Sequence, residues 1–585
     1  MVGFSNVLVA NRGEIAIRIF RTLRELGLSS VAVYSDADRG ALHVRVADQA
    51  VALGGETAAE SYLEVEKLLD AARTSGAEAV HPGYGFLAEN AGFARAVEQA
   101  GLVWIGPPPE AIELMGHKTA ARTRMREAGV PIIPGTTDPV ASPAEIVALG
   151  DEIGYPLVVK AAAGGGGKGM KIVRSSDEAE RAFESASREG QSYFADPAVY
   201  VERYLEDPRH VEVQVLADAH GNVIHLGERD CTIQRRHQKL VEETPSPAVD
   251  EELRGRIGKI AVDAARAAGY RSAGTIEGLL APDGSYYFME MNTRIQVEHT
   301  VTEEVTGLDL VREQVLIAAG EQLSLRQEDV VLRGHAIECR INAEDVSKGF
   351  LPAPGRITRY REPSGPGVRV DSGVVEGSEI SPLYDPMIAK LIVRDVDREH
   401  ARRRMLRALE EFEIGGVKTL LGFHRALLEH PCFVEAGTCH GVVESEQLAG
   451  RAEELTVEHK TSSDGVGRLV ERVTPVEVDG RRFEVTVLAS EPPWLELARS
   501  RRERVGAARH GGSDAVVSPM QGTVLSVAVA EGDVVEAGTV LCIVEAMKME
   551  NEIVAHRAGI VSELSVASGQ PVQNGQVICV LASDE

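Results

Sequence analysis

The start of the chain alternates between short apolar runs and one longer amphipathic stretch. The runs VLVA and SSVAVYSD have the composition of buried strands, and NRGEIAIRIFRTLRELG between them repeats apolar residues at helical spacing. The apolar face of this helix carries Ile15, Ile19, Phe20, Leu23 and Leu26. The pattern predicts a βαβ unit of a doubly wound α/β fold. It contains no G-x-G-x-x-G turn and so gives no support for a dinucleotide site.

A second buried strand, in AEAVHPGYGFLAEN, leads directly into the turn HPGYGF. Folds of this class place ligands in the turns that follow parallel strands, so this turn is a candidate ligand-binding element. Prolines from Pro107 to Pro109 mark the end of the first unit, near residue 110.

A glycine-rich loop interrupts the apolar pattern in YPLVVKAAAGGGGKGMKIV. A strand carrying Lys160 precedes the loop, Lys168 lies within it, and a second short strand follows. Glycine lets backbone amides approach phosphate oxygens closely, which predicts a mobile hairpin that covers phosphates. The alternative is a flexible linker. The segment is not a Walker A loop, because no G-x-x-x-x-G-K-[ST] leads into a helix.

The stretch YYFMEMNTRIQVEH carries a polar side chain at every second position. In an extended chain these side chains share one face; they are Glu290, Asn292, Arg294, Gln296 and Glu298. The preceding YYFM is apolar on both faces and predicts an interior strand that continues into a cleft. A solvent-facing edge strand is the alternative.

Glu277, in TIEGLL, is expected to present a second carboxylate from the neighbouring strand across the PDG turn. Magnesium is typically held by one or two carboxylates together with nucleotide phosphates. Glu277, Glu290 and Asn292 therefore form a candidate metal platform.

The last part of the chain contains an internal repeat of short apolar runs. GTVLSVAVAEGDVVEAGTVLC, beginning at Gly522, returns as GIVSELSVASGQPVQNGQVIC, beginning at Gly559. Two similar sets of short strands predict a small flattened β-barrel. Lys548 lies between the copies, and a two-residue turn of Met547 and Lys548 would project it from a hairpin tip. A lysine between two methionines has neither polar neighbours nor a carboxylate partner, so we expect it to be exposed for modification.

Composition narrows the class of protein. A chain of 585 residues with 44% hydrophobic and 26% charged residues is expected to form several soluble globular domains. Its net charge of −27 repels polyanions, so nucleic acid is an unexpected partner. The sequence has no signal-peptide pattern and no apolar run of about 18 residues, which predicts no membrane span and a cytoplasmic location.

The six cysteines form no C-x-x-C pair and are expected to be reduced and mostly structural. One group, His430, Cys432, Cys439 and His440, offers four zinc ligands. We favour a helix end followed by a loop there, because zinc fingers usually space their ligand pairs differently.

A set of ordered motifs resembles biotin carboxylase, a member of the ATP-grasp family, over about residues 5 to 445. The motifs are ANRGEIA, HPGYGF, MGHK, GGGGKGM, RHVEVQV, ERDCTIQRRHQK, EMNTRIQVEH and HAIECRINAED. The resemblance implies an α/β fold with a doubly wound N-terminal part, an ATP-grasp centre and an α+β C-terminal part. The sequence EAMKM around Lys548 resembles the biotin attachment motif of all-β biotinyl domains. Lipoyl domains share this fold, but their lysine is usually not placed between methionines.

The resemblance implies which residues bind the nucleotide. Lys118, Lys160 and His210 are expected to contact ATP phosphates, and Glu202 and Leu205 to flank the adenine. The remaining nucleotide contacts are assigned to Gly165, Gly166, Gly167, Gln234 and His237, with Lys239 serving the nucleotide and the reacting groups. The chain departs from the usual pattern at His117, where relatives often have aspartate, and at Arg203, where they often have lysine.

The same resemblance assigns the reacting groups. Arg294, Gln296 and the Val297 amide are expected to hold bicarbonate, and Glu298 is the candidate base. Arg340 matches the residue that stabilises negative charge on the biotin ureido oxygen, and Tyr84 is assigned to biotin. A structural ion pair of Arg340 with Glu338 or Glu344 is the alternative. The implied cofactors are biotin on Lys548, ATP, and magnesium or manganese.

The expected domains are an N-terminal α/β domain (1–113), an ATP-grasp domain (114–330) with a mobile lid at about 133–203, a C-terminal carboxylase domain (331–445), a linker (446–512) and a biotinyl carrier (513–585). Within the linker, TPVEVDGRRFEVTVLA predicts a hairpin turning at Asp479 and Gly480, and the basic run from Arg499 to Arg509 predicts a tether. The hairpin is alternatively a docking site for a partner subunit.

Together these features predict the α subunit of an acyl-CoA carboxylase, acting on acetyl- or propionyl-CoA through a separate carboxyltransferase β subunit. The residues outside the carboxylase and carrier parts are too few for a carboxyltransferase site. A biotin protein ligase and a hetero-oligomer are implied. The alternatives are a carrier or assembly subunit with an inactive ATP-grasp part, and the corresponding subunit of a pyruvate or urea carboxylase.

Overall fold

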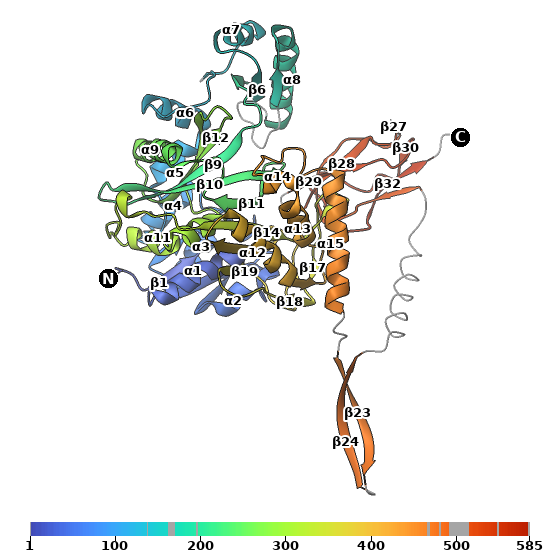
Figure 1. Ribbon diagram of the computed structural model, residues 1–585. Helices are drawn as coiled ribbons and strands as arrows, with labels where there is room; N and C mark the ends of the chain where they lie inside the picture. The colour runs from blue at the N-terminus through green and yellow to red at the C-terminus, as the bar shows by residue number, and fades with distance from the viewer. Residues whose placement is uncertain are drawn as a thin grey trace. The chain divides into compact units, whose positions relative to one another are not determined.

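The computed structural model describes residues 2–136, 138–161, 170–194, 197–464, 469–478, 481–490, 514–546 and 549–582 (Figure 1). The chain separates into two compact units. The first contains Met1–Ala343, Gly355–Ile380 and Met387–Gly450, and the second contains Glu344–Pro354, Ser381–Pro386 and Arg451–Glu585. None of the described helices is both long and apolar enough to cross a membrane.

The first unit opens with a parallel five-stranded sheet in the order β3-β2-β1-β4-β5. The strands are β1 (Asn6–Val9), β2 (Ser29–Tyr34), β3 (Gln49–Ala52), β4 (Ala79–His81) and β5 (Val103–Trp104). Helix α1 (Gly13–Glu25) connects β1 to β2, and its residues Ile15, Ile19, Phe20 and Leu23 are buried. The predicted βαβ unit is confirmed.

An eight-stranded sheet, in the order β13-β12-β9-β10-β11-β14-β21-β19, forms the centre of the same unit. Its strands are β9 (Arg209–Ala217), β10 (Val223–Arg235), β11 (Gln238–Thr244), β12 (Ser272–Leu280), β13 (Tyr286–Asn292), β14 (His335–Asn342), β19 (Val368–Ser372) and β21 (Met387–Asp395). Helix α9 (Glu251–Ala267) packs Ile257 and Ala261 against Val213 and Val215 of β9.

The prediction that YYFM lies in an interior strand is wrong, because β13 is the edge strand of this sheet. Its apolar residues are buried nonetheless: Tyr286 is 4% exposed and Phe288 is 1% exposed. Phe288 also forms an isolated bridge with Ile132, so the outer side of the strand is partly covered. The apolar residues on both faces of β13 are thus explained by the segment around Ile132 that covers the strand, and not by a central position in the sheet.

The predicted glycine-loop hairpin is present as the antiparallel strands β6 (Leu157–Ala161) and β7 (Met170–Val173). They form a three-stranded sheet with β8 (Val199–Arg203), and helices α7 (Pro143–Ile153) and α8 (Ala179–Phe194) lie beside it (Figure 1). The glycine loop itself, with Gly165, Gly166 and Gly167, lies outside the described residues.

The second unit contains two four-stranded sheets, in the orders β25-β32-β30-β27 and β29-β28-β26-β31. The strands are β25 (Ala515–Val517), β26 (Gly522–Val527), β27 (Val534–Val535), β28 (Val540–Ala546), β29 (Met549–Val554), β30 (Gly559–Ser562), β31 (Pro571–Val572) and β32 (Val577–Ala582). The repeats exchange strands, because β26 of the first copy pairs with β31 of the second and β27 pairs with β30. The predicted all-β carrier with its internal repeat is confirmed.

The segment before the carrier contains one predicted and one unpredicted element. Strands β23 (Leu469–Val478) and β24 (Arg481–Ser490) form the expected hairpin, with its turn outside the described residues. Helix α15 (Glu446–Asp464) was not predicted from the sequence. The proposed tether from Arg499 to Arg509 lies outside the described residues.

Candidate active site

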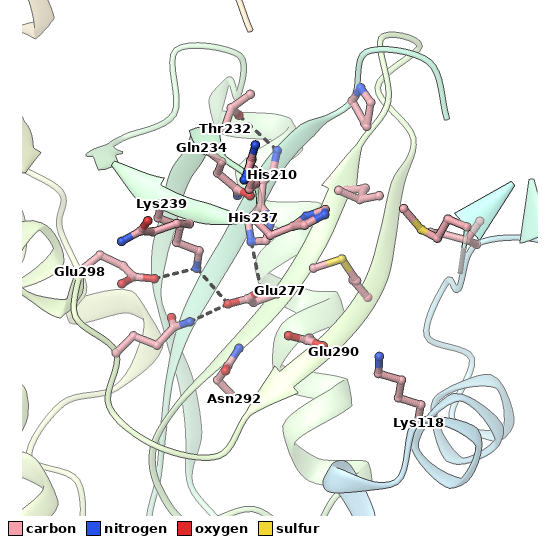
Figure 2. Close-up of a pocket in the computed structure, with 18 of the residues that line it drawn as sticks. Lys118, His210, Thr232, Gln234, His237, Lys239, Glu277, Glu290, Asn292 and Glu298 are labelled. Carbon is pink, nitrogen blue, oxygen red and sulfur yellow. Dashed lines mark hydrogen bonds and ion pairs between the residues drawn. The ribbon is translucent and has the colours of Figure 1, made fainter. Parts of the chain in front are cut away.

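A pocket of about 880 Å³ in the first unit gathers most of the residues that the sequence singled out. It is bordered by β10, β11, β12 and β13 and by the start of helix α6 (Lys118–Glu127), from which Lys118 points inward (Figure 2). The predicted residues that line it are Lys118, Lys160, Glu202, His210, Gln234, His237, Lys239, Glu277, Glu290, Asn292, Arg294, Gln296, Val297, Glu298 and Arg340. Leu205 and Tyr84 are not among the lining residues.

The two carboxylates of the candidate metal platform lie side by side. Glu277 of β12 is paired directly with Glu290 of β13, and Thr275 with Asn292, as the turn between the strands predicted. Desolvation and the neighbouring Glu277 charge raise the pKa of Glu290. A bound divalent cation would relieve this repulsion, so the pair fits a magnesium ion that also contacts nucleotide phosphates.

Asn292 is oriented by its neighbour. Its side-chain oxygen accepts a hydrogen bond from Arg294 Nη2 at 3.0 Å, while its buried Nδ2 has no hydrogen-bond partner among the described residues.

His210 Nε2 lies 3.1 Å from Glu277 Oε2. Together with Glu212, these two residues form a group whose ligand atoms lie close enough to hold a metal ion.

Lys239 is the charge centre of the pocket. Its ammonium group lies 2.6 Å from Glu212, 2.9 Å from Glu277 and 2.7 Å from Glu298. Figure 2 shows it between Glu277 and Glu298, with an ion pair to each. Burial would lower the pKa of Lys239, but the three carboxylates outweigh burial and raise it well above its ordinary value. Lys239 therefore stays charged.

Glu298 contacts two cations, because Arg340 Nη2 also lies 2.8 Å from its second carboxylate oxygen. Burial would raise the pKa of Glu298, but Lys239 and Arg340 outweigh it and lower that pKa below its ordinary value. The carboxylate is therefore ionised at neutral pH, and its proton affinity is low while both cations are paired with it.

The row of alternating polar residues is not one extended strand, as the sequence had suggested. Strand β13 ends at Asn292, and Glu298 is the N-cap of helix α10 (His299–Thr306). The segment between them bends, yet Arg294, Gln296 and Glu298 all still reach the pocket. Because the segment bends, these side chains converge on one small volume. In a flat strand, the residues from Asn292 to Glu298 would span about 20 Å.

Arg294 and Arg340 are held by carboxylates that the sequence reading did not assign. Arg294 Nε lies 2.8 Å from Glu89, which follows the HPGYGF turn. Arg340 Nε donates to Glu242 of the neighbouring strand at 2.6 Å. Burial raises the pKa of Glu242 to about 7, although Arg340 opposes the shift. Arg340 thus forms ion pairs with Glu242 and Glu298, neither of which the ion-pair alternative named.

A second unassigned group lies beneath the pocket. Arg229 is fully buried and donates to Glu212 at 2.6 Å, to Gln214 at 2.7 Å and to Gln296 at 2.8 Å. Gln296 in turn donates to Glu277 at 2.6 Å. The alternation in RHVEVQV, which turns Glu212 and Gln214 to one face, was the available signal for this network.

At the far side of the pocket, Glu202 pairs with Lys160 at 2.5 Å and with Arg122. Glu202 was expected to flank the adenine. It also forms an ion pair with Lys160, the lysine expected to contact the ATP phosphates. His440 and Glu444 also line the pocket and were not predicted as site residues.

The expectation that all cysteines are reduced is wrong for one pair. Cys432 and Cys439 form a disulfide with a Cα–Cα distance of 5.7 Å, and Cys231, Cys339, Cys542 and Cys579 are free and buried. The zinc alternative does not fit the described geometry, because His430 Nδ1 accepts from the Cys432 amide at 3.1 Å and His440 Nδ1 lies 2.5 Å from Asp207.

Lys548, the expected site of biotin attachment, lies outside the described residues. Strands β28 and β29 pair up to Ala546 and Met549, and Met547 and Lys548 are the two residues between them in the sequence.

Four family models match the chain. They are described as biotin carboxylase, N-terminal domain (residues 3–112), carbamoyl-phosphate synthase L chain, ATP binding domain (117–326), biotin carboxylase C-terminal domain (338–445) and biotin-requiring enzyme (514–581).

Two curated relatives and one solved structure show the extent of the similarity. The biotin-dependent acyl-coenzyme A carboxylase alpha3 subunit of Mycobacterium leprae is 49% identical over 94% of both chains. One subunit of the pyruvate carboxylase of Methanothermobacter thermautotrophicus is 52% identical over 81% of this chain and 96% of its own. The biotin carboxylase domain of Hydrogenobacter thermophilus 2-oxoglutarate carboxylase, solved with ADP, magnesium and bicarbonate, is 48% identical over 76% of this chain and 99% of its own, with a TM-score of 0.70.

These matches cover the doubly wound sheet, the pocket with its paired carboxylates, and the repeated β carrier. They support biotin as the covalent cofactor and ATP with magnesium as the nucleotide. The chain belongs to the biotin carboxylase family, as an ATP-dependent biotin-carboxylating ligase that carries its own biotinyl domain.

Proposed function

We propose that this chain carboxylates the biotin attached to its own Lys548 and delivers the carboxyl group to a separate carboxyltransferase β subunit, as the α subunit of an acyl-CoA carboxylase. The observation that carries the proposal is the contact of Glu298 with both Lys239 and Arg340 at the end of a nucleotide-sized pocket. The relative that matches 94% of this chain is an acyl-CoA carboxylase α subunit, which supports an acyl-CoA such as acetyl- or propionyl-CoA as the final acceptor.

In the proposed reaction, Lys118, Lys160 and His210 bind the phosphates of ATP, and Glu277, Glu290 and Asn292 would hold magnesium against them. Magnesium neutralises charge on the transferring phosphate when it is bound. Arg294, Gln296 and the Val297 amide hold bicarbonate beside the terminal phosphate. Glu298 accepts the bicarbonate proton, bicarbonate oxygen attacks the phosphorus, and ADP leaves.

The resulting carboxyphosphate breaks into carbon dioxide and phosphate next to biotin. The released phosphate takes the proton from the ureido nitrogen, negative charge gathers on the ureido oxygen, and Arg340 donates to that oxygen. The nitrogen then bonds to carbon dioxide. Arg340 is suited to this role because its guanidinium reaches the pocket from β14 while Glu242 holds it from behind.

The corresponding subunit of a pyruvate carboxylase is a second candidate, since one such protein is 52% identical. It matches 81% of this chain against 94% for the acyl-CoA carboxylase relative, so the acyl-CoA acceptor is favoured.

The test uses the purified full chain with ATP, magnesium and labelled bicarbonate. We expect bicarbonate-dependent ADP release that free biotin accelerates, and label retained on the chain. Intact mass should show one biotinyl group, absent from Lys548→Ala, which still carboxylates free biotin. A chain that releases no ADP under these conditions is an inactive carrier, and a Lys548→Ala chain that keeps its biotinyl mass refutes the attachment site.

A further inference from the structure

Lys390 is a fully buried lysine that the proposed reaction does not use. It lies near the middle of β21, in the interior of the eight-stranded sheet, and is 0% exposed. A buried ammonium group is costly unless it is paired and hydrogen-bonded, so its retention in the core calls for a specific set of partners.

Its closest contact is a backbone carbonyl beside the catalytic base. Lys390 Nζ donates to the carbonyl oxygen of Val297 at 2.9 Å, which is a full hydrogen bond. Two carboxylates at ion-pair distance are farther away, with Glu14 at 3.5 Å and Asp371 at 4.0 Å, and the charge of Lys390 also acts on Glu338. Asp371 is itself paired with Arg369 at 2.8 Å. The carbonyl is therefore the contact that orients the ammonium group.

The Val297 carbonyl belongs to the peptide unit that joins Val297 to Glu298. A planar peptide fixes the position of both of its Cα atoms, so a hydrogen bond to this carbonyl fixes the Cα of Glu298. Glu298 has φ −80° and ψ 10°, at the turn into helix α10. Within this turn, a small rotation of the peptide would swing the Glu298 side chain away from Lys239 and Arg340.

Lys390 and Arg340 approach this turn from the same side. In the antiparallel pairing of β14 with β21, Arg340 is directly opposite Lys390. Side chains of directly opposed residues lie on the same face of a sheet. Arg340 reaches the Glu298 carboxylate at 2.8 Å, and Lys390 reaches the carbonyl that precedes it. The two cations thus hold one residue at its side chain and at its backbone.

Lys390 also approaches the turn that carries Tyr84. Its ammonium group lies 6.0 Å from the centroid of the Tyr84 ring. A cation at this distance from an aromatic face is attracted to it. Glu14 belongs to helix α1, which connects strands β1 and β2 of the N-terminal sheet. Lys390 is therefore close to three separate segments, namely α1, the HPGYGF turn and the turn that contains Glu298.

We propose that Lys390 is a positioning residue for biotin carboxylation, which holds the peptide before Glu298 so that the carboxylate meets bicarbonate in the productive orientation. This inference rests on the proposed roles of Glu298 and Arg340. Lys390 is not among the residues that line the pocket, so we expect its loss to lower the turnover rate and to leave ATP binding intact. Misplacement of a catalytic group by about 1 Å costs on the order of 100-fold in rate.

The experiment compares three full-length variants with the parent chain. The double variant Lys390→Met/Glu14→Gln removes the ammonium group together with the charge of Glu14, the carboxylate nearest to it. Glu14→Gln alone keeps the bond from Lys390 to the Val297 carbonyl and is the matched control. Glu298→Gln reports separately on the catalytic assignment. For each we measure kcat and KM for bicarbonate-dependent carboxylation of free biotin, KM for ATP, and the thermal unfolding midpoint.

We expect the double variant to lose roughly 10- to 100-fold in kcat, with KM for ATP within about twofold of the parent. Glu14→Gln should keep a near-parental kcat. Equal losses in Glu14→Gln and in the double variant would overturn the inference, because the ion pair and not the carbonyl contact would then matter. A double variant that fails to fold, or that loses ATP affinity in parallel with kcat, would assign Lys390 to stability and also overturn it.

Failure of the underlying proposal has a different signature. If Glu298→Gln is fully active, the catalytic assignment is wrong whatever Lys390 does. If Glu298→Gln is inactive while the double variant is fully active, only the positioning role is wrong.

Discussion

Glu298 is the residue at which the interactions of the active site meet. It contacts Lys239 and Arg340, and its neighbour Gln296 is held by Arg229. In a buried site each of these charges is tolerable only because it is paired. In the proposed reaction, entering bicarbonate and phosphates would compete for the same cations, so substrate binding would exchange internal ion pairs for contacts with the reacting groups.

The first prediction concerns this carboxylate. Glu298→Gln keeps the shape of the side chain and removes its ability to accept a proton, so the rate of biotin carboxylation should fall by about 10² to 10⁴. KM for ATP should change little, because the proposed nucleotide contacts are made by other residues. Steady-state kinetics of the purified chain measures both quantities. Glu252→Gln, an exposed position on α9, is the control. A variant that loses ATP affinity and retains turnover would move Glu298 to the nucleotide side.

The second prediction concerns the paired carboxylates. Glu290→Gln leaves Glu277 as the only carboxylate at the metal platform formed by Glu277, Glu290 and Asn292. Loss of a ligand should raise the magnesium concentration needed for half-maximal activity by at least about 10-fold, while saturating magnesium restores part of the rate. Titration of magnesium at fixed ATP tests this. An unchanged magnesium requirement would exclude Glu290 from the metal site.

At the scale of elements, the contact between α1 and β21 carries a pH dependence. Glu14 of α1 is buried beside Lys390, and burial raises the pKa of its carboxyl to about 7 while Lys390 only partly opposes the shift. The folded state therefore binds this proton more tightly than the unfolded chain does. The stability contributed by Glu14 is fully present below the unfolded pKa of 4.5 and is lost as the pH rises through the folded value.

Glu14→Gln removes this loss, which gives the third prediction. The variant should gain stability relative to the parent chain between about pH 5 and about pH 8, by up to about 3 kcal/mol. Denaturant unfolding of both chains at the two pH values measures the difference. If the difference in free energy of unfolding between the two chains does not change with pH, Glu14 is ionised equally in the folded and unfolded chains.

Elements whose signal is local were predictable from the sequence. The first βαβ unit, the hairpin around the glycine loop and the β repeat each follow from apolar periodicity and turn residues. The pairing of Glu277 with Glu290 followed from the turn between their strands. The edge position of β13 did not, because burial by Ile132 and its neighbours gives an edge strand the pattern of an interior one.

The parts of the site that could not be predicted from the sequence depend on contacts between segments far apart in the chain. Lys390 meets Val297 across 93 positions, and Arg229 meets Gln296 across 67. Arg229 stands in the motif ERDCTIQRRHQK and Lys390 in an ordinary strand pattern, but neither setting indicates the distant partner. The bend after Asn292 was also hidden, because Glu298 ends the alternating row while capping a helix.

At the scale of the whole chain, the proposed division of labour concerns which reaction the chain completes alone. The pocket and the matched family segments account for ATP-dependent carboxylation and for the carrier. Between them lie only residues 446–512, a segment too short for a carboxyltransferase domain with its own oxyanion hole, and its described residues form helix α15 and the hairpin of β23 and β24. Transfer to an acyl-CoA requires such a hole to stabilise the enolate of the acceptor.

The last prediction is that the chain stalls after the first half-reaction. With ATP, magnesium and labelled bicarbonate, label should accumulate on Lys548 and remain there when acetyl-, propionyl- or longer acyl-CoA is added. Addition of a co-purified carboxyltransferase should move the label to one class of acyl-CoA, since the acceptor pocket belongs to that partner. Lys548→Ala with the same partner is the control and should transfer no label, because the carrier raises the local concentration of carboxybiotin at the second site. Label that reaches acyl-CoA from the purified chain alone would place both half-reactions on one polypeptide and end the two-subunit proposal.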